Sequence, residues 1–193
     1  MLIVRAVSVV CFWLHPLEGQ ITVKVHNLAH VAPWDLRLAE ERASGIFRHA
    51  KVTINWELIP KGDAQGQQRS EPWNPADLHL RLWTRAAIGS NTFSDWTLGF
   101  CLSKEQSTAV VLADEIQRRA EADSSNPGDL LGLVMAHEIG HLLLPSPVHS
   151  DEGIMQARVP TGLSDRRRML LAFSRQQAAL FRSEVGRRAG AGK

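Results

Sequence analysis

The sequence lacks tyrosine entirely and contains only two cysteines in 193 residues. The absence of tyrosine excludes any mechanism that needs a phenol as metal ligand, general acid or oxyanion donor. Two cysteines are too few for a disulfide scaffold. The remaining composition, with 44% apolar and 22% charged residues, is typical of a globular protein and excludes collagen-like, coiled-coil and disordered chains. The length favours one domain.

The chain has little excess charge, since its formal net charge is +2, so composition demands no polyanionic partner. The charge is nevertheless uneven: residues 158–193 hold nine basic residues against Asp165 and Glu184, a net charge of +7. Such a segment can bind nucleic acid or anionic lipid, or it can be the solvated face of a helix. Because aromatic residues do not interleave with the basic ones, we expect the solvated face and no nucleic-acid partner.

The only long apolar run at the N-terminus covers residues 1–14 and ends at His15 and Pro16. It is too short to span a bilayer, which takes about 20 residues. Its length suits the core of a secretory signal, with a buried first strand as the alternative. We therefore predict a signal or N-terminal extension at 1–19, one domain at 20–188 and a tail at 189–193. Secretion or a periplasmic location follows, with a cytoplasmic location as the open alternative.

Hydrophobic periodicity predicts a series of strands before residue 115. The predicted strands are residues 21–26, 52–59, 78–84 and 108–113, the last of them buried or at a sheet edge. Apolar residues at three- and four-residue steps predict a helix after the first strand, with Asp35 as candidate N-cap. Residues 60–74 predict an exposed loop. Cys101 lies in an apolar stretch and is expected to be a buried, inert thiol.

Two helices are predicted in the second half of the chain. The first is capped by Asn126, continues to Leu144 and is stopped by Pro145 and Pro147. The last begins at Ser174 with a capping box. The order strand, helix, strand, strand, strand, helix, irregular loop, helix predicts an α/β sandwich with helices packed on a small sheet.

A metal-binding pattern lies within the first of these two helices. His137 and His141 are four residues apart, so both imidazoles project from one helix face and can share a metal ion. Glu138 lies about 100° around the helix, where it can take a proton from a water on the metal. This is the HExxH arrangement of zinc peptidases. The alternative is a pair of surface histidines beside a solvated glutamate.

Catalytic zinc needs a third protein ligand, and His149 is the candidate. The prolines after Leu144 turn the chain out of the helix, and eight extended residues reach about 26 Å, enough to return to the metal. Asp151 and Glu152 are the competing ligands.

The segment from His137 to Met155 resembles a metzincin, since HExxH, a third His followed by Ser, and Gly153-Ile154-Met155 have counterparts in that family. The His149-Ser150 pair followed by a Met-turn is most similar to the matrixin branch. Astacin- and serralysin-like members carry a Tyr just after the Met, which this chain lacks. The chain departs from the family in the eight-residue His141–His149 interval, where six is usual, and in Leu144 at the position of the turn glycine.

The resemblance implies a metzincin-like (zincin) sandwich: a small mixed twisted sheet with two main helices and a C-terminal helix. It implies one catalytic Zn²⁺, Glu138 as general base and Met155 as structural support, and leaves structural calcium open. Peptide or protein would be the substrate, bound along an edge strand formed by 98–102 or 108–113, and we expect a monomer. Substrate-binding residues would be Gln156, Ala157, Val159 and Pro160.

Two other functions fit the same pattern. One is a zinc hydrolase acting on RNA, against which Glu138 argues, because zinc endoribonucleases with three histidines have no glutamate beside the first. The other is a catalytically impaired binding module in which zinc only stabilises the fold.

Overall fold

The computed structural model describes residues 19–60, 74–89, 93–146, 148–159, 167 and 170–191. These residues form five strands and five helices. In chain order they are β1 (Gly19–Asn27), α1 (Pro33–His49), β2 (Val52–Leu58), β3 (Leu78–Trp83), α2 (Arg85–Ile88), β4 (Gly99–Ser103), β5 (Thr108–Leu112), α3 (Ala113–Ala122), α4 (Pro127–Leu143) and α6 (Arg175–Ala191). The predicted α/β class is confirmed.

The strands form one mixed sheet in the order β2-β1-β3-β5-β4. The first four run parallel to one another, and β4 pairs antiparallel with β5 at the edge. All five residues of β5 are buried, as expected for a strand flanked on both sides. Of the two segments considered as a candidate edge strand, 98–102 therefore overlaps the edge strand β4, and 108–113 overlaps the buried strand β5.

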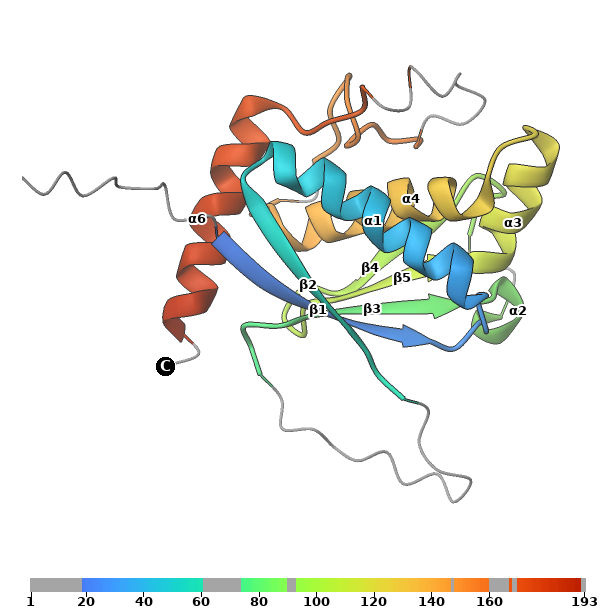
Figure 1. Cartoon of the computed structure of the whole chain (residues 1–193), viewed down its shortest axis with the longest axis horizontal. Helices are drawn as coiled ribbons and strands as arrows, with labels where there is room; N and C mark the ends of the chain where they lie inside the picture. The colour runs from blue at the N-terminus through green and yellow to red at the C-terminus, as the bar shows by residue number, and fades with distance from the viewer. Residues whose placement is uncertain are drawn as a thin grey trace, which may run out of the picture.

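Helices α1 and α4 pack against each other over one face of the sheet (Figure 1). Close approach depends on Gly132, where a Cβ would lie 2.6 Å from the carbonyl oxygen of Ala39. Nearly every residue of α4 is buried. The polar residues of this helix are therefore buried in the protein interior, where electrostatic interactions are stronger than in water.

Helix α6 lies beside the start of β1 and one end of α4 (Figure 1). The predicted capping box is confirmed: the Ser174 hydroxyl accepts from the Gln177 amide at 3.2 Å, and the Gln177 side chain accepts from the Ser174 amide at 2.8 Å. The helix continues to Ala191, within the segment predicted as a tail.

Several sequence predictions differ from the structure. The N-cap of α1 is Ala32, because Pro33 occupies the first helical turn, and Asp35 lies inside that turn. Helices α2 and α3 were not predicted. Cys101 is exposed rather than buried, because it lies on the edge strand. Residues 1–18, most of the predicted loop 60–74, and Pro160 lie outside the described residues.

None of the helices within the described ranges is both long enough and apolar enough to cross a membrane.

Candidate metal centre

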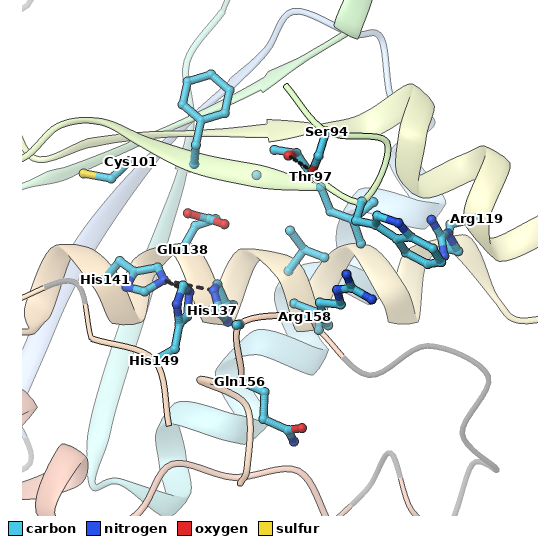
Figure 2. A pocket seen from close by; sticks show the side chains of 17 residues that line it. Ser94, Thr97, Cys101, Arg119, His137, Glu138, His141, His149, Gln156 and Arg158 are labelled. Atoms are coloured by element: carbon cyan, nitrogen blue, oxygen red, sulfur yellow. Dashed lines mark hydrogen bonds between the residues drawn. The ribbon is translucent and has the colours of Figure 1, made fainter. Parts of the chain in front are cut away.

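Three histidine side chains converge beside the C-terminal half of α4. His137 and His141 lie one turn apart on this helix, and their Nε2 atoms are 2.9 Å apart. His149, after the helix has ended, brings its Nε2 to 3.2 Å from that of His141. Figure 2 shows the three rings turned toward one another, and one ligand atom from each lies within 4.8 Å of the others. The eight-residue interval therefore does allow His149 to reach the pair.

The geometry of this cluster fits a metal ion. Tetrahedral zinc at 2.0–2.1 Å from each nitrogen would separate the ligand nitrogens by about 3.3 Å. The two observed Nε2 separations are close to that value, so small ring rotations suffice. A set of three imidazoles suits zinc, copper, iron or nickel. The competing candidates Asp151 and Glu152 are exposed and do not belong to the cluster.

A backbone carbonyl orients the first ligand. The Nδ1 of His137 lies 2.8 Å from the carbonyl oxygen of Ile154, which fixes Nδ1 as the protonated nitrogen and leaves the Nε2 lone pair free for a metal. The turn that presents this carbonyl contains Gly153 at φ +76°, a conformation that favours glycine. The amide of Ser150 donates to the carbonyl of Met155 at 2.8 Å and closes the turn.

Met155 supports this turn from below the helix. Its side chain is fully buried, and its sulfur lies so near Gly140 that a Cβ there would be 2.6 Å away. Met155 therefore packs against α4, and its role as support for the metal centre stays a prediction.

Burial keeps the two helical histidines neutral. Desolvation lowers the pKa of His137, and it lowers that of His141 to about 3, with the neighbouring His137, His149 and Lys104 adding to the effect. Neutral imidazole is the form that binds a metal.

Glu138 lies beside the three histidines, and its side chain points from α4 toward β4 (Figure 2). Its side chain is 4% exposed, and burial raises its pKa to about 8 in the absence of a cation. Among the described residues its Oε2 has no hydrogen-bond partner. A bound dication would favour the carboxylate form. The side chain has room because residue 99 is glycine: a Cβ at Gly99 would lie 2.6 Å from Oε1 of Glu138.

A cleft of about 600 Å³ runs between β4 and α4 and contains the histidines and Glu138. Of the predicted substrate-binding residues, Gln156, Ala157 and Val159 line it. Sequence reasoning missed Gly99, Trp96, Arg119 and Arg158, which also line it. A glycine inside the apolar run 98–102 was the one available signal, since glycine within a strand indicates close approach.

Comparison with models of protein families found no match, and comparison with curated proteins found none either. The functional assignment of this chain therefore rests on the geometry of its own site.

Proposed function

We propose that this chain is a zinc-dependent endopeptidase of the metzincin type, with Glu138 as general base. One observation carries the proposal: three imidazole nitrogens converge in a cleft bounded by a strand edge, and the buried carboxyl group of Glu138 lies beside them without belonging to the cluster. The HExxH spacing, the third histidine and the Met-containing turn agree with it.

Zinc held by the three histidines would supply Lewis acidity, polarising a peptide carbonyl and acidifying a water molecule. Glu138 would accept a proton from that water while the oxygen of the water forms a bond to the carbonyl carbon of the peptide. The same carboxyl group would then donate the proton to the amine as the C–N bond breaks. Because the chain has no tyrosine, no phenol assists these steps.

The peptide would bind by adding to the free edge of β4. This edge faces the cleft, and the other edge of β4 pairs with β5. Main-chain hydrogen bonds to an added strand hold an extended peptide without regard to its side chains. Secretion or a periplasmic location belongs to the proposal and rests on the pattern of residues 1–14 alone.

Glu138→Gln tests the proposal. The variant keeps shape and volume but cannot accept the proton, so we expect one bound zinc per chain and a loss of kcat/KM of about 10²–10⁴-fold on denatured casein. His149→Ala is the matched variant for the ligand set and should lose zinc itself. Zinc content by mass spectrometry and peptide release are measured on the same samples.

The same experiment separates the alternatives. Zinc-loaded protein that cleaves RNA and not casein supports the RNA hydrolase. Zinc that raises the melting temperature of protein inactive on both substrates supports the binding module. Full activity of Glu138→Gln would contradict the assigned role of Glu138.

A further inference from the structure

One end of the cleft is formed by two arginines and a tryptophan from three separate segments. Trp96 precedes β4, Arg119 lies on α3, and Arg158 follows the Met-containing turn. The guanidinium carbons lie 4.3 Å (Arg119) and 4.9 Å (Arg158) from the centre of the Trp96 ring. Figure 2 shows Arg119 and Arg158 at the opposite end of the cleft from His141.

Both guanidinium groups are available to a ligand. No carboxylate of the described residues forms an ion pair with Arg119 or Arg158, whereas their neighbour Arg118 is bonded to Glu115. The only carboxylate lining the described part of the cleft is Glu138, which lies beside the histidines. This end therefore carries two arginines that form no ion pair with a carboxylate of the described residues.

The loop that carries Trp96 is held in place by hydrogen bonds from Arg85 and between its own hydroxyls. Arg85 bonds Glu115 at 2.7 Å and donates to the carbonyl oxygens of Phe93 and Ser94 at 3.3 and 3.1 Å. The Ser94 and Thr97 hydroxyls lie 3.0 Å apart and close the loop. These bonds hold the backbone on both sides of Trp96, whose ring is 54% exposed and contacts the two arginines. Arginines held against a ring lose less conformational entropy when they bind.

We propose that Arg119 and Arg158 bind a carboxylate of the peptide substrate, and that they set the cleavage preference of the enzyme. The inference rests on the proposed function. Guanidinium groups match carboxylates through paired hydrogen bonds, and neither Arg119 nor Arg158 uses its N–H groups in an ion pair with a described carboxylate. The carboxylate is either an acidic side chain or the free C-terminus of the peptide.

The strand direction assigns this carboxylate to one side of the cleaved bond. β4 begins beside the Trp96 loop and runs along the cleft toward Ser103. Antiparallel pairing is the more stable arrangement for an added strand. A peptide bound in that way has its C-terminal part at the arginine end, so the recognised group follows the cleaved bond.

The test compares matched fluorogenic peptides cleaved by zinc-loaded protein. In the first series the peptides have an amidated C-terminus and carry either Glu or Gln at one of the three positions after the cleaved bond. In the second series the peptides end at one of these three positions, with either a free carboxylate or an amide. We expect at least about a tenfold higher kcat/KM for the carboxylate-bearing member of one pair, a ratio that corresponds to about 1.4 kcal/mol. The position and series of that pair identify the source of the carboxylate.

The double variant Arg119→Ser, Arg158→Ser should reduce this ratio to about one. Its charge-matched control is Arg37→Ser, Arg48→Ser, which removes two exposed arginines of α1, one of them stacked on Trp34 at 4.7 Å and outside the cleft. This control should keep both the ratio and the activity. High salt should lower the ratio in the wild type, because the site is partly exposed.

Equal kcat/KM for the members of every pair would overturn the inference and leave the proposed function standing. If zinc-loaded protein cleaves no peptide, the proposed function fails, and peptide binding measured by tryptophan fluorescence decides the inference. In that case the inference is supported if the Glu peptides bind more tightly than the Gln peptides and the double variant loses this difference. Equal binding, or binding of a short RNA that is lost in the same variant, overturns it.

Discussion

Gly99 is a residue whose lack of a side chain matters for the chemistry. Alanine there would place a Cβ 2.6 Å from Oε1 of Glu138 and 2.8 Å from its Cγ and Cδ, so the carboxylate must move. We expect Gly99→Ala to lower kcat/KM at least about tenfold, since displaced catalytic groups lose rate steeply. Zinc affinity should be unchanged, because the histidines are not displaced. Peptide cleavage and zinc titration measure the two effects.

Gly45→Ala is the control for this variant. A Cβ at Gly45 meets nothing within 4 Å. Because Gly45 lies inside α1, alanine should stabilise the fold by about 0.5–1 kcal/mol without changing activity. An active Gly99→Ala enzyme would show that Glu138 does not need its observed position.

Glu115 is the residue through which pH should affect stability. Burial acts to raise its pKa, but hydrogen bonds and charge from Arg118 and Arg85 outweigh burial and lower it below the ordinary 4.5. A carboxyl group with a lowered pKa stabilises the fold above its unfolded-state pKa, and this contribution is lost as pH falls through the folded-state pKa. We expect Glu115→Gln to cost about 1–3 kcal/mol at pH 7.

The difference between wild type and Glu115→Gln should shrink as pH falls from about 5 to 3, measured by urea unfolding. Glu121→Gln, an exposed change on the same helix, should cost less than about 0.5 kcal/mol. A difference between wild type and Glu115→Gln that stays constant with pH would contradict the role given to the Arg85–Glu115 pair.

At this scale the sequence predicted the groups that belong to a local motif and missed a backbone carbonyl and two arginines that only the fold brings to the cleft. His137, Glu138, His141 and His149 were all identified, because imidazole and carboxylate at helical spacing carry a specific signal. The carbonyl of Ile154 has no sequence signature. Arg119 and Arg158 resembled ordinary surface charges, since only the fold brings them to Trp96.

At the scale of elements, the metal centre depends on how the turn at 153–155 fits under α4. Gly153 has φ +76°, and a Cβ there would collide with the carbonyl oxygen of Ala172. We expect Gly153→Ala to lower stability and, by displacing the Ile154 carbonyl, to weaken zinc binding about 10–100-fold. Urea unfolding of the metal-free protein and competitive zinc titration measure the two effects.

Gly89→Ala is the matched variant, because Gly89 also has positive φ, +83°, but open space around it. It shares the backbone strain and lacks the collision, so Gly153→Ala should cost at least about 1 kcal/mol more. Equal zinc affinity in the two variants would remove the turn from its positioning role.

Elements with strong local signals were predicted well, and those without were not. Asn126 and Pro127 marked the start of α4, and Ser174 marked that of α6. Helix α3 follows β5 without a breaking residue, so no stop signal separated them. β4 is irregular at Cys101 and Ser103, where its register with β5 shifts, and regular alternation is lost there.

At the scale of the whole molecule, Arg188 joins α6 to the segments that precede β3 and β5. The side chain is 7% exposed, and it bonds Glu184 and the Ser107 hydroxyl, both at 2.8 Å, and the Pro75 carbonyl at 3.3 Å. Arg188→Ala leaves the Ser107 hydroxyl and the Pro75 carbonyl without this donor and Glu184 with Arg187 alone, and we expect a loss of about 2–4 kcal/mol in urea unfolding. Part of the basic C-terminal segment therefore serves packing.

Arg187→Ala is the control, because Arg187 also bonds Glu184 but is 64% exposed. Its loss should cost less than about 1 kcal/mol. Equal costs for the two variants would mean that α6 is not held through Arg188.

The candidate metal ligands and the carbonyl that orients one of them come from one continuous stretch, 137–155, whereas the walls of the cleft come from Ser94, residues 96–101, Arg119 and residues 156–159. Under the proposed function, catalysis and selectivity would thus be encoded in different parts of the chain. Substitutions in the walls could accumulate one at a time without changing the histidine cluster. A library confined to Trp96, Arg119, Arg158 and Val159 would accordingly vary peptide preference while the three histidines and Glu138 stay the same.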